Sequence, residues 1–344
     1  MTPNQSFERT HNGMGRVQRR DFLIASGVLL GAPFASEAQQ PAKIARIGFL
    51  ALDLAGNPRG SDAFHQGLRD LGYIEGRNVI IVYRDAEGKT DRLPTLAAEL
   101  IALKVDVIVA PTVLASLAAK QATRTIPIVF AGATDPVADG LVISFARPGG
   151  NVTGLSNLGP ELIGKRLELL TQTVPGVSRV AVLWQPGGGG ERTDKDMLKG
   201  AEVAARALKV QHQFVEARGP SDFDRAFSEM ARARADALLV LPYAIMFTER
   251  RRLVDLAAKN RLPAMYPSRQ YVDAGGLMGY GPSLIDLLRR TATFVDRILK
   301  GASPGELPVE QPTKFELVIN LKTAKALGVV IPQAVLGRAD EVIQ

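Results

Sequence analysis

Residues 126–156 read IPIVFAGATDPVADGLVISFARPGGNVTGLS, and this stretch indicates the class of fold. It begins with an apolar run, residues 126–130, that is typical of a strand buried on both faces of a sheet. Small residues and one carboxylate follow, and the loop signal Arg147-Pro-Gly-Gly-Asn151 precedes a second strand-like segment. Open α/β sheets bind ligands where their strands end. The stretch therefore predicts a binding loop followed by a crossing to a second lobe.

Strand-like and helix-like segments alternate with short connections on both sides of this stretch. After residue 160 the same rhythm restarts and continues to residue 266. Such alternation predicts an α/β fold of two Rossmann-like lobes with parallel sheets and right-handed crossovers. Ser61 is the expected N-cap of the first helix. Before residue 126 we expect strands at 44–50, 78–83 and 105–110 and helices at 61–71, 91–103 and 112–123.

Three hinge connectors are expected between the lobes, because Gly- or Pro-rich segments interrupt the alternation near residues 151–155, 275–280 and 306–312. They divide the chain into an N-terminal lobe, residues 43–155 plus 283–310, and a C-terminal lobe, residues 156–282 plus 311–344. Lobes joined in this way can close on a ligand by hinge motion.

Composition indicates a globular chain and excludes several kinds of site. The 344 residues are 46% hydrophobic and 22% charged, enough for two domains of ordinary size. Cysteine is absent, which excludes disulfides, thiolate metal ligands and cysteine nucleophiles. The formal net charge is +7, but the basic residues are scattered and aromatic residues make up 6%. Without a stacking platform among the charges, we expect a solvated basic surface and no nucleic-acid partner.

The N-terminal segment has the features of an export signal. Gln18-Arg-Arg-Asp-Phe-Leu23 holds a twin-arginine pair, and a short apolar stretch then leads to Ser36-Glu-Ala38, which offers small residues for cleavage. We expect residues 1–38 to be a signal peptide of the twin-arginine type, with the Sec route as the alternative and Met1 or Met14 as the start. Cleavage near Ala38 would leave a periplasmic protein.

Catalytic and metal-binding motifs are not found. The three histidines lack ligand-like spacing, so we expect no metal ion and no serine–histidine–acid triad. Gly159-Pro-Glu-Leu-Ile-Gly-Lys-Arg166 approaches a phosphate loop, but Arg166 stands where a magnesium-binding hydroxyl is needed, and the surrounding leucines indicate a helix. We therefore expect no enzymatic activity and no cofactor.

Polar and aromatic residues gather at the carboxyl ends of the expected strands, among them Gln185 and Ser268. Thr112 begins a helix, where free amides favour an anion such as a carboxylate, and Asp135 suits a cationic amine. The alternatives are that Thr112 and Asp135 only cap a helix and a turn, and that Trp184 and Tyr266 are core aromatics. The candidate ligand-binding residues are Thr112, Thr134, Asp135, Ser156, Asn157, Trp184, Tyr243, Tyr266 and Tyr280.

A known family shares motifs with this chain from residue 42 to residue 343. The chain resembles the substrate-binding proteins of ABC importers in the tryptophan/tyrosine-type group, which have the type I periplasmic binding protein fold. It departs from them at Gln185-Pro-Gly-Gly-Gly-Gly190, where members often carry Asn-Pro-x-Asn. The shared motifs include Gly67-Leu-Arg-Asp-Leu-Gly-Tyr73, Asp135-Pro136, Arg147-Pro-Gly-Gly-Asn-Val-Thr-Gly-Leu155, Gly164-Lys-Arg-Leu167, Tyr280-Gly281 and Pro308-Val-Glu-Gln-Pro-Thr-Lys-Phe-Glu-Leu-Val-Ile-Asn320.

The resemblance implies capture of a small ligand between the lobes and its delivery to a membrane permease driven by a cytoplasmic ATPase. The expected ligand is an amino acid or a related carboxylate, with an aromatic amino acid as one candidate. The expected partners are the ligand, the permease and its ATPase, with the membrane reached only through the permease. Two alternatives stay open: a ligand-binding partner of a sensor system and a secreted hydrolase.

Overall fold

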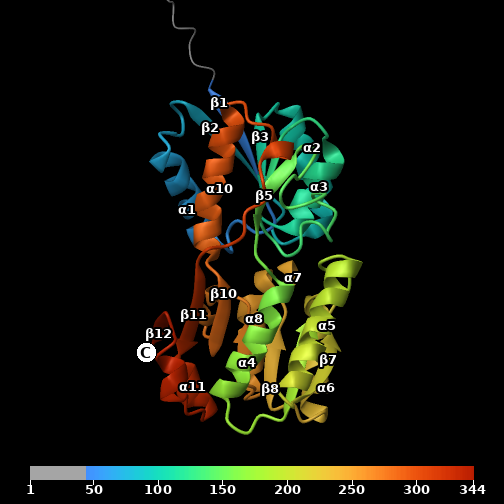
Figure 1. Ribbon diagram of the computed structural model, residues 1–344, viewed down its shortest axis with the longest axis vertical. Helices are drawn as coiled ribbons and strands as arrows, with labels where there is room; N and C mark the ends of the chain where they lie inside the picture. The colour runs from blue at the N-terminus through green and yellow to red at the C-terminus, as the bar shows by residue number, and fades with distance from the viewer. Residues whose placement is uncertain (1–43) are drawn as a thin grey trace, which may run out of the picture. The chain divides into compact units, whose positions relative to one another are not determined.

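Two β-sheets organise the chain in the computed structural model, which describes residues 44–344 (Figure 1). The first sheet has five strands that pair in parallel in the order β2-β1-β3-β4-β5. Their bounds are β1 (Ala45–Ala51), β2 (Val79–Asp85), β3 (Val107–Ala110), β4 (Ile128–Ala133) and β5 (Val152–Ser156).

The second sheet has seven strands in the order β12-β11-β10-β9-β8-β6-β7. We refer to the part of the chain around each sheet as the first and the second lobe. The strands of the second sheet are β6 (Arg179–Trp184), β7 (Gln211–Glu216), β8 (Ala237–Val240), β9 (Ala264–Tyr266), β10 (Met278–Pro282), β11 (Phe315–Asn320) and β12 (Glu341–Ile343).

Helices cover both faces of the first sheet, which is why its strands are almost continuously apolar. Side chains of α2 (Leu93–Ala102) and α3 (Val113–Ala122) pack on one face around Phe130. Side chains of α1 (Pro58–Asp70) and α10 (Leu284–Leu299) pack on the other face around Phe49. A short 3-10 helix, η1 (Thr90–Arg92), leads into α2.

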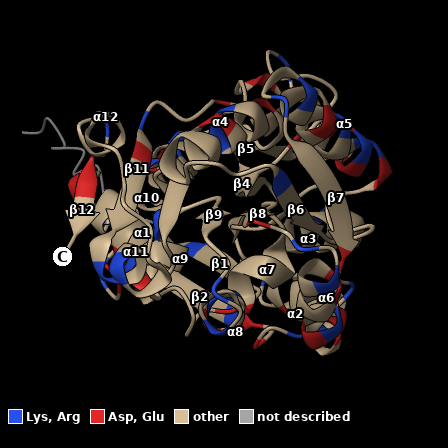
Figure 2. Cartoon of the chain, turned by 90° about the horizontal axis from the view of Figure 1, so that it is seen from below, with Lys and Arg blue, Asp and Glu red and all other residues tan. Residues whose placement is uncertain are grey.

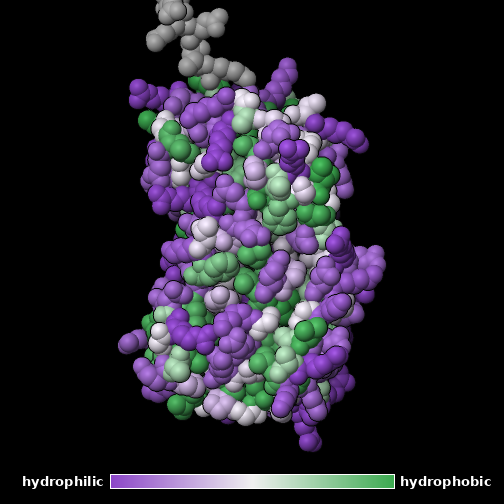
Figure 3. Space-filling model, viewed as in Figure 1, coloured by the Kyte–Doolittle hydropathy of each residue, from purple (hydrophilic) through white to green (hydrophobic). Residues whose placement is uncertain are grey.

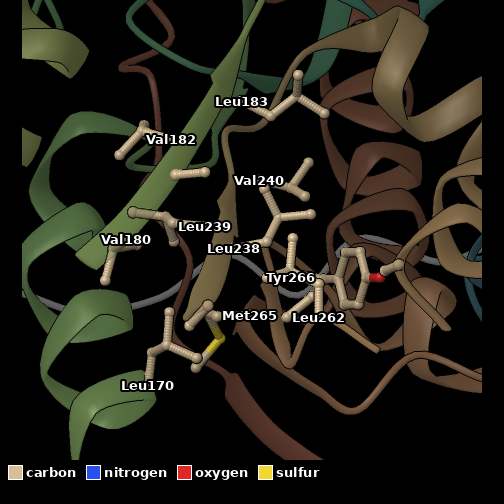
Figure 4. Close-up of a cluster of buried hydrophobic side chains, with 14 of the residues drawn as sticks. Leu170, Val180, Val182, Leu183, Leu238, Leu239, Val240, Leu262, Met265 and Tyr266 are labelled. Atoms are coloured by element: carbon tan, nitrogen blue, oxygen red, sulfur yellow. The ribbon is translucent and has the colours of Figure 1, made fainter. Parts of the chain in front are cut away.

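The second lobe is built in the same way. One continuous buried cluster joins its helices to the sheet, and it includes Leu170 of a helix, Val182 of β6, Leu239 of β8 and Met265 of β9 (Figure 4). Its helices are α4 (Ile163–Thr173), α5 (Glu191–Ala207), α6 (Phe223–Arg232), α7 (Ala244–Thr248), α8 (Arg250–Lys259), α9 (Arg269–Asp273), α11 (Leu321–Leu327) and α12 (Gln333–Leu336), with the 3-10 helices η2 (Pro160–Leu162) and η3 (Pro220–Asp222); η4 (Pro304–Glu306) follows α10.

The α/β class and the two-sheet arrangement confirm the expected fold, with one difference in strand direction. β11 pairs with β10 in antiparallel orientation, whereas the other pairs of the second sheet are parallel. The cause is the path of the chain. β10 leaves the sheet towards α10 in the first lobe, and β11 enters from that lobe beside it, so the two neighbours run in opposite directions (Figure 1).

Segments that cross between the lobes hold the two sheets with their carboxyl edges towards each other. β5 leads out of the first sheet to the second lobe, and β10 leads out of the second sheet to the first lobe. A third segment returns from η4 to β11, and it pairs with β5: the Ser156 amide donates to the Glu310 carbonyl at 2.9 Å, and the Glu310 amide donates to the Gly154 carbonyl at 3.0 Å. The exact domain boundaries given above stay a prediction.

Individual elements begin and end within a few residues of their expected positions, but the cap of the first helix was wrong. α1 begins at Pro58, three residues before Ser61, because proline is well suited to a first helical turn. The Ser61 hydroxyl lies inside the helix and donates to the Pro58 carbonyl at 2.8 Å. Thr112, in contrast, is the N-cap of α3. The expected signal peptide lies outside the described residues.

The surface carries both signs of charge in close alternation. Along α5, Glu191 pairs with Lys195 and Glu202 with Arg206, and blue and red residues alternate over this helix in Figure 2. Hydrophilic residues dominate the face shown in Figure 3, with apolar residues in small groups. Within residues 44–344 no helix combines the length and apolar character needed to cross a membrane.

The packing of α10 against α1 depends on Gly67. A Cβ at this position would lie 2.2 Å from the Arg289 carbonyl oxygen and 2.9 Å from the Ala292 Cβ, closer than atoms can approach. We expect Gly67→Ala to force the helices apart and lower the free energy of unfolding by about 1–3 kcal/mol, measured by urea denaturation.

The matched control is Gly200→Ala, inside α5. A Cβ there meets ordinary contacts at 3.7 Å or more, so alanine should stabilise the helix by roughly 0.5–1 kcal/mol. Equal effects of the two substitutions would contradict the proposed role of Gly67.

Candidate ligand-binding site

A cavity of about 180 Å³ lies where the carboxyl edges of the two sheets face each other. In the first lobe its walls are the segments that follow β1, β3 and β4, and in the second lobe they are the segments that follow β6, β8 and β9. α10 adds Leu284, Leu287 and Leu288. This is the place where parallel α/β sheets bind ligands, because every strand there ends in a loop.

Apolar side chains make up most of the wall. Phe49 and Leu52 come from the first lobe, and Phe247 comes from α7 in the second lobe. Among the described lining residues two carry a formal charge, Asp53 and Arg166. Such a site suits a small ligand with an apolar body and few polar groups.

Arg166 is a charged residue in an unusual, buried environment. Its side chain projects from α4 and is 1% exposed. Nε donates to the Tyr280 carbonyl at 2.8 Å, and Nη2 donates to the Pro267 carbonyl at 3.3 Å. Nη1 has no hydrogen-bond partner, and no carboxylate of the described chain forms an ion pair with this guanidinium. Burial lowers the pKa of Arg166 to about 10, so the group still carries its charge at neutral pH.

Two hydroxyl groups on the same wall also have no partner. Ser268 Oγ and Tyr271 OH are buried, and neither makes a hydrogen bond within the described part of the chain. The Tyr271 ring stacks on Tyr266, with ring centroids 4.9 Å apart. Burial raises the pKa of Tyr271, so its hydroxyl stays a neutral donor. Among the residues that line the cavity, the second lobe therefore holds one cation and two hydroxyls that lack acceptors.

The first lobe and its crossing segment contribute smaller polar groups. The Thr112 hydroxyl accepts from the Ala115 amide at 3.2 Å as the N-cap of α3, and Thr134 is buried nearby in the same wall. Asn157 donates from Nδ2 to the Gly132 carbonyl at 2.8 Å, which leaves its buried Oδ1 as an acceptor without a partner.

Tyr243 lines the cavity with its ring while its hydroxyl is used elsewhere. Tyr243 OH donates to Asp194 Oδ1 at 3.0 Å. Asp194 also accepts from the amides of Gly187 at 2.6 Å and Gly189 at 3.2 Å. The buried carboxylate thus fixes the glycine-rich loop after β6 against the tyrosine, and Gly188 and Gly189 of that loop line the cavity.

The structure brings four of the nine candidate residues to the cavity wall: Thr112, Thr134, Asn157 and Tyr243. Asp135 lies beside the wall, where Oδ1 accepts from the Val137 and Ala138 amides at 3.1 and 2.9 Å and caps the turn. Neither Tyr266 nor Tyr280 lines the cavity, but each contacts a residue that does. Tyr266 stacks on Tyr271, and the Tyr280 carbonyl accepts from Arg166. Ser156 and Trp184 also lie outside the lining residues. As ligand contacts, all nine stay predictions.

Sequence reasoning missed Asp53, Arg166 and Tyr271 as site residues. A signal for Arg166 was present, because Ile163, Arg166, Leu167 and Leu170 follow the spacing of one helix face. A charged residue on an apolar face is buried, and a buried charge needs a partner. The described residues hold no cluster of three or more His, Asp or Glu side chains placed to bind a metal ion.

Comparisons with known proteins find a family and several relatives that are similar to this chain. The model of a family described as ABC transporter substrate binding protein matches residues 57–343. A tyrosine-binding protein of Clostridioides difficile is 28% identical over 272 residues, 78% of this chain and 76% of that protein. A conserved domain protein from Vibrio cholerae superposes with a TM-score of 0.81 at 28% identity, covering 87% of this chain and 100% of that one.

A second solved structure is the ABC domain from Streptococcus pneumonia in complex with L-Trp. It superposes with a TM-score of 0.80 at 26% identity, covering 87% of this chain and 99% of that one. These similarities, together with the two parallel-dominated sheets, confirm the type I periplasmic binding protein fold.

A contact between the lobes beside the cavity should respond to pH. The Thr193 hydroxyl on α5 donates to Asp139 Oδ1 at 2.7 Å, and Asp139 Oδ2 is buried without a partner. Burial, helped by the carboxylates of Asp135 and Asp194, raises the pKa of Asp139 to about 7, although the Thr193 hydrogen bond acts in the opposite direction.

The folded protein thus holds a proton on Asp139 between about pH 4 and pH 7 that the unfolded chain releases. This stabilisation is complete below about pH 4 and is lost as the pH rises through about 7. Asp139→Asn keeps an acceptor for Thr193 and carries no charge, so it should raise the free energy of unfolding at pH 8 by about 1–3 kcal/mol and change little at pH 4. Thermal unfolding from pH 4 to pH 8 measures the difference, with exposed Asp196→Asn as the control. Parallel curves for Asp139→Asn and wild type would rule out this explanation.

Proposed function

We propose that this chain, which belongs to the family of ABC transporter substrate-binding proteins, captures an amino acid or a related carboxylate in the cavity between its lobes. The observation that carries the proposal is the cavity itself, enclosed by both lobes at the carboxyl edges of their sheets. A ligand held there touches both lobes, so its binding energy favours the closed arrangement.

Aromatic amino acids are the first candidates among these ligands. The apolar wall offers Phe49 and Phe247 as neighbours for a ring. The tyrosine-binding and tryptophan-bound relatives support this choice. We propose that the ligand contacts Thr112, Thr134, Asn157 and Tyr243. Tyr266 and Tyr280 would act indirectly, by positioning Tyr271 and Arg166.

The cellular role that we propose is delivery of this ligand to an ABC permease and its ATPase. Residues 1–38 would direct export to the periplasm and then be removed, and the protein would bind without chemical turnover. Loss of the gene should abolish uptake of the radiolabelled ligand by intact cells, and N-terminal sequencing of the exported protein should begin near Gln39. Unchanged uptake would argue against transport.

A thermal-shift screen of amino acids and related carboxylates tests the binding activity. A true ligand at about 100 times its Kd adds roughly 2.7 kcal/mol to the free energy of unfolding. We expect L-tryptophan or L-tyrosine to raise Tm, because the cavity combines apolar walls with a few polar groups.

A cavity-filling variant controls for binding elsewhere. Ala244 lines the cavity, so Ala244→Phe should remove the shift, while Ala207→Phe, exposed at the end of α5, should keep it. A ligand that shifts both variants equally binds outside the cavity and contradicts the proposed site.

A further inference from the structure

Arg166 is a buried cation for which the folded chain supplies no counter-ion. Taking a charged group out of water costs several kcal/mol unless an opposite charge or sufficient hydrogen bonds compensate. The two backbone carbonyls described above use Nε and Nη2 and leave Nη1 without a partner. Asp53 is the acid on the cavity wall, but it belongs to the other lobe, and its Oδ1 accepts from the Gly56 amide at 2.9 Å.

The backbone around Arg166 holds the guanidinium in a fixed orientation. A Cβ at Gly281 would lie 3.2 Å from Nη2 and 2.0 Å from the Pro267 carbonyl oxygen, so only glycine allows β10 to approach this closely. The two carbonyl bonds occupy one edge of the guanidinium. Nη1 is thereby left as a preorganised donor in a residue that lines the cavity.

The same wall carries the hydroxyls of Ser268 and Tyr271, which also lack partners. Ser268 directly follows Pro267, whose carbonyl binds Arg166, so the serine lies next to the guanidinium along the chain. One positive charge and two neutral hydroxyl donors, without an acceptor among the described residues, match the needs of one carboxylate. A phosphate would bring nearly twice the charge to a cavity wall on which Arg166 is the one cation among the described lining residues.

We propose that Arg166, together with Ser268 and Tyr271, is the receptor for the ligand's carboxylate, and that the site selects monocarboxylates with an apolar body. This inference rests on the proposed function and names the group that confers its ligand class. It moves the anion-binding position from Thr112 and the start of α3 to the second lobe. The apolar body then lies towards Phe49, Leu52 and α10, and Asn157 Oδ1 is available for an ammonium group.

The test compares acids with their amides on the full-length protein. Calorimetric titration measures the Kd of L-tryptophan and L-tyrosine and of their carboxamides for wild type, Arg166→Met and Arg166→Lys. Wild type should prefer the acids by about 100-fold, since a carboxylate gains a charge-assisted hydrogen bond in a dry site that a neutral amide does not. Arg166→Met should lose this preference, and Arg166→Lys should keep part of it.

Lys165→Met is the matched control, because it removes one positive charge from the same helix outside the cavity wall. Its preference for the acids should equal that of wild type. The wild-type comparison needs no variant, so a variant that fails to fold does not weaken the test.

Each remaining outcome has a distinct meaning. If wild type binds the amides as tightly as the acids, or if Arg166→Met keeps the preference, the carboxylate receptor is overturned while ligand binding in the cavity stands. If neither acids nor amides bind, and the wider screen of carboxylates also finds no ligand, both the proposed function and this inference are wrong.

Discussion

Backbone pairing between two of the crossing segments is the constraint on which the rest of the molecule depends. The end of β5 and the segment around Glu310 exchange two hydrogen bonds, so two passages between the lobes form one short ladder. Gly154 makes the first passage possible, because a Cβ there would lie 2.1 Å from the Phe130 carbonyl oxygen. The paired segments join the lobes at the carboxyl edges of both sheets, and the cavity lies between those edges.

The cavity wall combines rigid support with polar groups that the chain leaves unsatisfied. Asp194 fixes the glycine-rich loop through two amides and Tyr243, so this carboxylate is fully used by the fold. Arg166 is the opposite case, since it is a buried cation that lines the cavity and its Nη1 has no hydrogen-bond partner. Natural proteins retain destabilising groups of this kind where function requires them, because stability elsewhere offsets a destabilised site.

The sequence allowed the architecture to be predicted far better than the site. Apolar runs such as residues 126–130 depend on local composition, and their alternation with helices predicts mainly parallel sheets. Thr112 was found because an N-cap is a local pattern. The direction of β11 could not be found in this way, because it depends on the lobe from which the chain returns. Arg166 was missed because the pair Lys165-Arg166 resembles solvated charge. The helix-face spacing indicates its burial, but the partners that hold it, the carbonyls of Tyr280 and Pro267, appear only in the folded structure.

The unequal distribution of polar groups over the two lobes explains how binding could be coupled to closure. The second lobe holds donors that lack acceptors, and the first lobe with its crossing segment holds apolar surface and the Asn157 acceptor. A ligand that has both a carboxylate and an apolar body would therefore contact both walls. The desolvation of Arg166 has already been offset during folding, so a carboxylate that reaches it gains a charge-assisted hydrogen bond without a further ordering cost on the protein side. If the proposed function holds, that gain is complete only when the first lobe covers the rest of the ligand and excludes water, so recognition of the ligand would favour closure of the lobes.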